Sequence, residues 1–170
     1  MYTVNSIRNI CLLGHSGSGK TALAESLLYM TGAIDRIGKN ADGNTVCDYD
    51  PEEAKRRASL SLAVAPVEYD GVKINLIDTP GLFDFELGLH EGIRAAESVL
   101  ITVSGRSGLT VGAQKAYKLA LKHGKSRMIY ISKIDAEHAD FYKVFEELKA
   151  EFGPSICPVV VPIEQAGGRV

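Results

Sequence analysis

The amino-acid sequence predicts an α/β domain with a mostly parallel β-sheet, one antiparallel strand, and helices on both faces of the sheet. Short apolar runs alternate along the chain with segments whose apolar residues recur at helical spacing, which is the pattern of parallel crossover units. Asp70-Gly71 separates two strand-like runs, and this dipeptide is a strong signal for a two-residue hairpin. The 170 residues are enough for one domain with a full hydrophobic core.

The first predicted unit is a strand, a glycine loop and a helix. Residues 7–13 form a nearly continuous apolar run, as in a strand buried on both faces of a parallel sheet. Residues 20–30 carry leucines at helical spacing, and Gly32 supplies a C-terminal stop. Further strands are expected over 60–69, 72–78, 99–103, 128–131 and 157–163, and further helices over 86–96, 113–123 and 139–152.

A long polar segment, residues 33–58, follows the first predicted helix and is interrupted by glycines. One short helix is expected within it, because Asp50 can cap a helix whose first position is Pro51. Long loops inside compact domains are usually functional or disordered. The segment is therefore a candidate mobile switch.

Composition gives the chain no general affinity for a charged partner. Its formal charge is −2, so no direct DNA binding is expected. The basic run at 55–57 is either a phosphate contact or a solvated helix end. Cys11, Cys47 and Cys157 lack metal-ligand spacing and are expected to be reduced thiols. No apolar run is long enough for a membrane span, and no signal peptide is evident, so the expected compartment is the cytoplasm.

The segment Gly14–Thr21 fits the phosphate-binding pattern G-x-x-x-x-G-K-[ST]. In such a loop, consecutive backbone N–H groups surround a phosphate chain, and the following helix N-terminus adds positive potential. Lys20 is expected to reach the β and γ phosphates, and the Thr21 hydroxyl is expected to bind Mg²⁺. The residues expected to surround the phosphates are His15, Ser16, Gly17, Ser18, Gly19, Lys20 and Thr21.

A second motif, Asp78-Thr79-Pro80-Gly81, ends an apolar strand. Asp78 stands where an acidic group can hold Mg²⁺ through water. The N–H of Gly81 can turn toward a γ-phosphate, so that its loop responds to the presence of that phosphate. We therefore expect Lys20 and Gly81 to carry the chemistry at the γ-phosphate.

A third motif, Ser132-Lys133-Ile134-Asp135, follows the apolar strand predicted over 128–131, at the carboxyl edge of the sheet. The Asp135 carboxylate can accept paired hydrogen bonds from guanine N1 and N2, which adenine does not offer. Ser132, Lys133 and Asp135 are expected to select GTP over ATP. The three motifs together predict a Ras-like P-loop NTPase sandwich with GTP or GDP and Mg²⁺ as its ligands.

With these motifs, the chain resembles the N-terminal GTP-binding domain of translation elongation factor G, and especially its elongation-factor-G-like paralogues. The likeness covers essentially the whole chain and includes residues 8–10, 28–32, 48–52, 64–66, 74–81, 84–85, 132–135 and 139–142. It implies that residues 1–170 are the first part of a larger ribosome-associated protein. On this basis the chain stops near an inserted subdomain, before the last base-contact loop and the downstream domains. The fragment itself is expected to be monomeric.

Four residues depart from the family pattern. Gly17 replaces an Asp of the phosphate loop, and Ser132 replaces the usual Asn of the base motif. Counting back from 64–66, Ser59 stands in place of a Mg²⁺-binding Thr, so the resemblance adds Ser59 to Thr21 and Asp78 as a metal residue. Leu82 replaces a water-orienting His. Leucine cannot hydrogen-bond water, so slow intrinsic hydrolysis is expected.

Three functions follow from these patterns. The favoured one is a GTP-hydrolysing switch of the ribosome-associated elongation type. An alternative is a GTP-binding module with negligible hydrolysis that signals by nucleotide occupancy, for which Leu82 is the main support. A P-loop kinase or other ATPase is the third, and the pair Lys133 and Asp135 argues against it.

Overall fold

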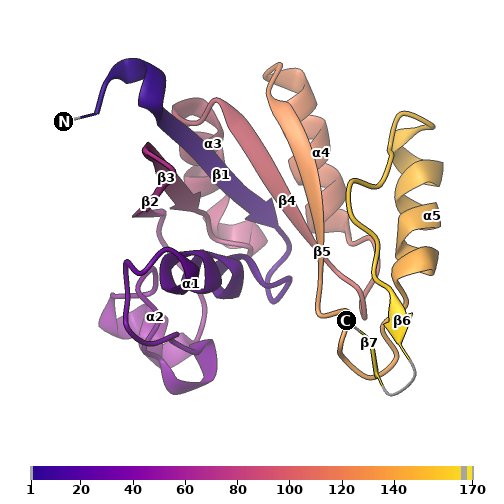
Figure 1. Cartoon of the computed structure of the whole chain (residues 1–170), viewed down its shortest axis with the longest axis horizontal. Coiled ribbons are helices and arrows are strands. Elements are labelled where there is room, and N and C mark those ends of the chain that lie inside the picture. The colour runs from indigo at the N-terminus through magenta and orange to yellow at the C-terminus, as the bar shows by residue number, and fades with distance from the viewer. Residues whose placement is uncertain (1, 166–167, 170) are drawn as a thin grey trace.

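A computed structural model describes residues 2–165 and 168–169. Its central element is a five-stranded sheet in the order β2-β3-β1-β4-β5 (Figure 1). The β1 strand pairs in parallel with β3 and β4, β4 pairs in parallel with β5, and β2 is antiparallel to β3. The strands are β1 (Ile7–Gly14), β2 (Ala63–Tyr69), β3 (Val72–Asp78), β4 (Ser98–Ser104) and β5 (Ser126–Ser132). The predicted mixed α/β fold and its antiparallel hairpin at Asp70-Gly71 are confirmed.

Helices cover both faces of this sheet, and a two-stranded sheet lies near the C-terminus. The helices are α1 (Lys20–Met30), α2 (Pro51–Arg56), α3 (Glu86–Ala95), α4 (Val111–Lys122) and α5 (Phe141–Phe152). Short 3-10 turns are η1 (Val4–Ser6), η2 (Asn40–Asp42) and η3 (Phe83–Phe85), and the small sheet pairs β6 (Glu164–Gln165) with β7 (Gly168–Arg169). No helix in residues 2–165 or 168–169 is long and apolar enough to cross a membrane.

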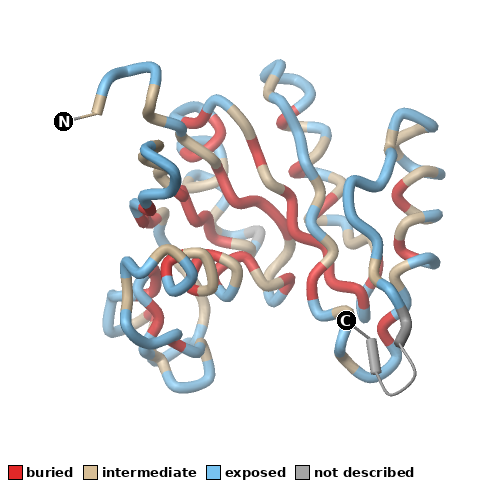
Figure 2. The backbone as a smooth tube through the Cα atoms, in the orientation of Figure 1, coloured by how far each residue is buried: buried red, intermediate tan, exposed pale blue. Residues whose placement is uncertain are grey.

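Two apolar clusters hold the layers together, and buried positions follow the middle of the sheet (Figure 2). On one face, alanines of α4 and residues of α5 pack against β1 and β4. On the other face, α1 packs against β2 and β3 through Leu28 and Ala24. The small alanine side chains at 113, 116 and 120 are all fully buried and let α4 approach the sheet closely.

The segment predicted as a mobile switch is hydrogen-bonded to α1 in its middle part. The buried Glu25 carboxylate of α1 accepts hydrogen bonds from Gly38 N at 2.8 Å and Val46 N at 2.5 Å. The predicted cap is confirmed, because the Asp50 side chain accepts from Glu52 N and Pro51 begins α2. The buried Glu25 carboxylate thus positions the middle of this polar segment against α1.

Two strand predictions were wrong in their extent. Residues 60–62 do not belong to β2, because the backbone N–H groups of Leu60 and Ser61 donate to the Glu53 carboxylate. Residues 157–163 form no strand, and Val159 and Val160 are 77% and 80% exposed. An apolar run without a paired sheet edge does not become a strand, since its backbone groups lack a partner ladder.

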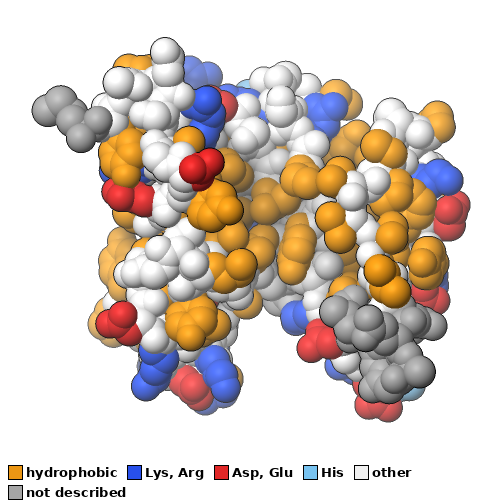
Figure 3. Space-filling model, in the orientation of Figure 1, with side chains coloured by type: hydrophobic (Ala, Val, Ile, Leu, Met, Phe, Trp, Pro, Cys, Tyr) orange, Lys and Arg blue, Asp and Glu red, His pale blue; other side chains and the backbone are white. Residues whose placement is uncertain are grey.

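The outer end of the sheet is partly uncovered. On β5, Ile129 and Ile131 pack toward the cluster around α4 and α5, so the alternating Met128 and Tyr130 lie on the other face, where they are 54% and 44% exposed. Figure 3 shows apolar side chains gathered in a hollow between the α1 side of the molecule and its C-terminal segment.

Candidate nucleotide-binding site

The phosphate-loop candidate connects the end of β1 to the start of α1. Gly14 has φ of 141°, and a Cβ there would lie 2.5 Å from the Thr102 carbonyl oxygen of β4. Gly19 precedes the first residue of α1 and has φ of 99°. Both positions favour glycine because of their positive φ, and at Gly14 the close approach of β4 excludes a Cβ as well. The sequence pattern therefore corresponds to a tight loop wrapped at the end of the central strand.

Lys20 lies inside that loop. Its ammonium group donates to the carbonyl oxygens of Gly14 and His15, each at 3.1 Å, and the residue is only 5% exposed. Burial lowers the pKa of Lys20, while Asp78 and Asp48 act in the opposite direction. The loop thus holds a buried cation pointing at its own concave side, ready for an anionic ligand.

The three residues predicted to hold a metal ion meet beside Lys20. The Thr21 hydroxyl donates to Asp78 Oδ2 at 2.6 Å, and Thr21 Oγ1 lies 3.3 Å from Ser59 Oγ. Asp78 is 1% exposed, and burial raises its pKa to about 6. Its other oxygen, Oδ1, has no hydrogen-bond partner within the described residues. A buried, unpartnered carboxylate oxygen beside two hydroxyls fits the oxygen ligands that Mg²⁺ prefers.

The sequence analysis did not single out Asp48, which completes this cluster. Ser59 Oγ donates to Asp48 Oδ1 at 2.7 Å, and Asp48 Oδ2 accepts from Asn40 at 2.9 Å and Thr45 at 3.1 Å. The residue is 4% exposed. Asp48 stands in the segment 48–52 that carried the family resemblance, but no local pattern marks an acid in a polar loop as buried.

The loop after β3 lies directly over the phosphate loop. Ser16 N donates to the Gly81 carbonyl oxygen at 3.0 Å. A Cβ at position 81 would be 2.5 Å from Lys20 Nζ and 2.6 Å from Ser16 N, so the approach depends on glycine. Leu82 comes next and is 39% exposed. Gly81 and Lys20, predicted to act together, are thus adjacent in space.

The predicted base loop donates two hydrogen bonds to the phosphate loop. Ser132 Oγ donates to the Ser18 carbonyl oxygen at 2.6 Å, and Lys133 Nζ donates to the Gly17 carbonyl oxygen at 2.7 Å. Asp135 is exposed and lines an open pocket of about 370 Å³. The structure therefore brings all the predicted nucleotide residues to one edge of the sheet.

Thr102 is a second residue that the sequence analysis missed. It is fully buried on β4, where its hydroxyl lies 2.6 Å from Ser18 Oγ and donates to the Leu13 carbonyl oxygen at 3.2 Å. The Thr102 hydroxyl therefore holds the phosphate loop against β4. A hydroxyl within the apolar run 99–103 was the available sequence signal, because buried polar groups need partners.

The sheet, the glycine loop between β1 and α1, and the loops after β3 and β5 define a nucleotide-binding domain of the P-loop GTPase class. The family model described as "Elongation factor Tu GTP binding domain" matches residues 5–166. The chain belongs to this family, and it is a GTP-binding domain of the elongation-factor type.

Similar proteins support the resemblance to elongation factor G-like proteins that the sequence predicted. The chain is 38% identical over 163 residues to an elongation factor G-like protein of Thermotoga maritima, covering 96% of the chain and 23% of the relative. It is 36% identical over 156 residues to one of Mycobacterium tuberculosis, covering 92% and 22%. A crystal structure from Thermus thermophilus superimposes with a TM-score of 0.92 at 38% identity, covering 97% of this chain and 25% of that one. The chain thus spans less than a quarter of the two curated relatives.

Proposed function

We propose that this domain binds GTP and GDP together with Mg²⁺ and hydrolyses GTP, as the switch of an elongation factor G-like protein that acts on the ribosome. The observation that carries the proposal is the meeting of three loops around Lys20 at the end of β1. One loop contributes the phosphate-binding backbone, one contributes Asp78 and Gly81, and one contributes Asp135. The first loop binds the phosphates, the second supplies the metal and γ-phosphate contacts, and the third selects the base.

In this proposal the phosphate chain lies in the loop 14–21, with the Lys20 charge beside its β and γ phosphates. Thr21, Asp78 and Ser59 hold Mg²⁺, which supplies charge neutralisation on the phosphates. Asp135 reads guanine from the open pocket, and the bonds of Ser132 and Lys133 to 17–18 fix the distance between the base and phosphate regions.

Hydrolysis is proposed to be slow in isolation. Gly81 lies against Lys20. Once a phosphate contact replaces the hydrogen bond from Ser16 N to Gly81 O, the N–H of Gly81 can turn to the γ-phosphate. The next side chain, Leu82, cannot orient water. A positioned acid or base typically contributes about 10²–10⁴ in rate, so this contribution has to come from a partner. The ribosome is the proposed partner, reached through the whole protein.

A second candidate function rests on the same residue. The half-exposed, apolar Leu82 beside Gly81 also suits a module that signals by GTP occupancy with negligible hydrolysis. Single-turnover GTP hydrolysis, measured with and without ribosomes, separates the two. The GTPase predicts ribosome-dependent phosphate release, whereas the occupancy module predicts nucleotide-dependent ribosome binding without phosphate release.

A further inference from the structure

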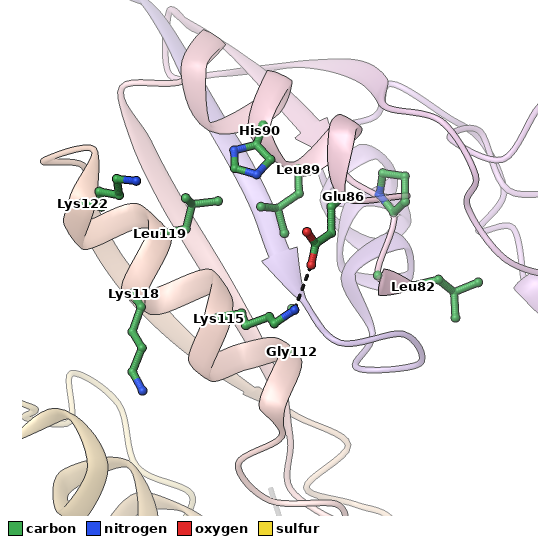
Figure 4. Close-up of a pocket in the computed structure, with 12 residues that line it drawn as sticks. Leu82, Glu86, Leu89, His90, Gly112, Lys115, Lys118, Leu119 and Lys122 are labelled. Atoms are coloured by element: carbon green, nitrogen blue, oxygen red, sulfur yellow. Dashed lines mark hydrogen bonds and ion pairs between the residues drawn. The ribbon is translucent and has the colours of Figure 1, made fainter. Parts of the chain in front are cut away.

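The acids around the nucleotide site differ in what they bind. Glu86, at a cleft of about 340 Å³ between α3 and α4, pairs with Lys115 at 2.9 Å (Figure 4). The polar segment 33–58 contributes two buried acids, Asp48 and Glu53, which are 4% and 2% exposed. Within the described residues, Asp48 accepts hydrogen bonds from side chains, whereas Glu53 accepts only from backbone N–H groups. Glu53 therefore acts on the course of the chain.

The Glu53 carboxylate joins the two ends of the turn that contains α2. Its Oε1 accepts from the backbone N–H groups of Leu60 at 2.8 Å and Ser61 at 2.9 Å. Its Oε2 accepts from Asp50 N at 3.3 Å, at the residue that caps α2. In residues 2–165 and 168–169 no cation lies in ion-pair distance of Glu53, so these three N–H groups compensate its burial.

The hydroxyl protons of the metal candidates are both used in bonds to carboxylates. Ser59 Oγ donates to Asp48 Oδ1 at 2.7 Å, and Thr21 Oγ1 donates to Asp78 Oδ2 at 2.6 Å. A hydroxyl has one proton, so the two hydroxyl oxygens approach to 3.3 Å with lone pairs between them. Asp78 Oδ1, unpartnered in the described part of the chain, adds another oxygen without a proton. This arrangement favours a cation.

The direction of the Ser59 hydroxyl depends on its bond to Asp48. Serine lacks the second Cβ substituent that restricts χ1 in β-branched residues, so its own rotamer preference is weak. Asp48 stands two residues before Asp50, and Ser59 directly precedes Leu60. Glu53 bonds to both Asp50 and Leu60. The Glu53 carboxylate thereby keeps Asp48 and Ser59 within hydrogen-bonding distance of each other.

We propose that Glu53 is a positioning residue of the cation site, which closes residues 48–61 so that Asp48 takes the Ser59 proton and the Ser59 oxygen is left to bind Mg²⁺. The inference deepens the proposed function and rests on it. Glu53 acts through Ser59 and touches only backbone. Replacing a group that orients a metal ligand typically costs about 10–100-fold in metal affinity, although the group does not touch the metal.

The test uses the 170-residue chain with a fluorescent, non-hydrolysable GTP analogue and a titration of Mg²⁺. The half-saturating Mg²⁺ concentration is expected to rise about tenfold in Glu53→Gln, because the amide turns a donor toward a backbone N–H. Glu53→Asp keeps the charge on a side chain that is too short to span the turn, and a similar rise is expected. Glu52→Gln is the matched control at the next residue of α2, whose side chain is 45% exposed, and no change is expected.

A second measurement separates positioning from a general loosening of the fold. Ser59→Ala removes the oxygen through which Glu53 acts, and by itself it is expected to raise the half-saturating Mg²⁺ concentration. Adding Glu53→Gln to Ser59→Ala should then change that concentration less than about twofold. Two independent effects would instead multiply. Circular dichroism of each variant shows whether it is folded, and Glu53→Asp carries the test where Glu53→Gln does not fold.

The outcomes distinguish this inference from the proposed function. An unchanged Mg²⁺ requirement in the folded Glu53 variants, with the analogue still bound, overturns the inference and leaves the proposed function standing. Multiplying effects, no effect of Ser59→Ala, or an equal rise in Glu52→Gln also overturn it, because Glu53 then does not act through the Ser59 oxygen. Failure of the unaltered chain to bind the analogue at any Mg²⁺ concentration counts against the proposed function, and the inference falls with it.

Discussion

The Thr21 hydroxyl donates a 2.6 Å hydrogen bond to Oδ2 of Asp78, 57 residues further along the chain. This bond joins the start of α1 to the end of β3 and leaves the second Asp78 oxygen buried without a partner among the described residues. Burying this carboxylate lowers the stability of the metal-free domain, whereas a bound cation would pair with its charge. Five experiments follow from this and the neighbouring contacts.

Asp78→Asn is expected to stabilise the metal-free domain at pH 8, by on the order of 3 kcal/mol, because the amide avoids burying a charge. The pKa of Asp78 is raised to about 6 from 3.8, so wild-type stability is lost as pH rises through 6. The gain over wild type should therefore shrink as pH falls from about 6 and approach zero below about pH 3, where the carboxyl is protonated in both the folded and unfolded states. Chemical unfolding at several pH values measures it. Asp84→Asn, at an exposed position, is the control, and an equal gain there would contradict the prediction.

Mg²⁺ with GDP should raise the melting temperature of the domain, whereas Mg²⁺ with ADP should not. Ligand at 100 times its dissociation constant adds about 2.7 kcal/mol. For a domain of this size that corresponds to roughly 5–11 °C. Differential scanning fluorimetry with each nucleotide, and again after chelation of the metal, measures the effect. Equal shifts with ADP would show that Asp135 does not select the base.

Lys20→Ala should abolish nucleotide-dependent stabilisation, because Lys20 is the cation held inside the phosphate loop by Gly14 and His15. Thermal shift with saturating GDP is the measurement. Lys143→Ala removes an equal charge at an exposed position and should keep the full shift. A normal shift in Lys20→Ala would mean that the phosphates bind elsewhere.

Asp135→Asn should lower the affinity for GDP and raise the affinity for xanthosine diphosphate relative to it. The amide places a donor opposite the guanine donors, and xanthine offers an oxygen there instead. Competition against fluorescent GDP gives both affinities. Asp140→Asn makes the same chemical change at the cap of α5, where asparagine also caps well, and should leave both unchanged. Wild-type GDP affinity in Asp135→Asn would refute the base-reading role.

Leu82→His should raise GTP hydrolysis toward the scale of about 10²–10⁴ typical of acid–base catalysis, with little change in GDP affinity. The side chain follows Gly81 at the γ-phosphate side of the loop and lies away from the base pocket. Single-turnover hydrolysis with ribosomes present is the assay. Leu87→His, at an exposed leucine on α3, controls for an added imidazole. An unchanged rate in Leu82→His would favour the occupancy-signalling module.

Local patterns in the sequence were sufficient for most of the fold. The apolar run before Gly14, the helical spacing after Lys20 and the Asp70-Gly71 hairpin each depend on neighbouring residues, so periodicity and turn chemistry predict them. The same reasoning failed over 157–163, where an apolar run lacks a paired sheet edge. Apolar character alone does not supply hydrogen-bond partners for a strand.

The sequence by itself determined which residues stand at the carboxyl ends of β1, β3 and β5, because each motif follows an apolar run. Only the tertiary structure decided which of them touch. The order β2-β3-β1-β4-β5 brings Lys133 to Gly17 across 116 residues and Thr21 to Asp78 across 57 residues. These relationships depend on how strands and helices pack, and packing joins residues whose separation along the chain carries no periodic signal.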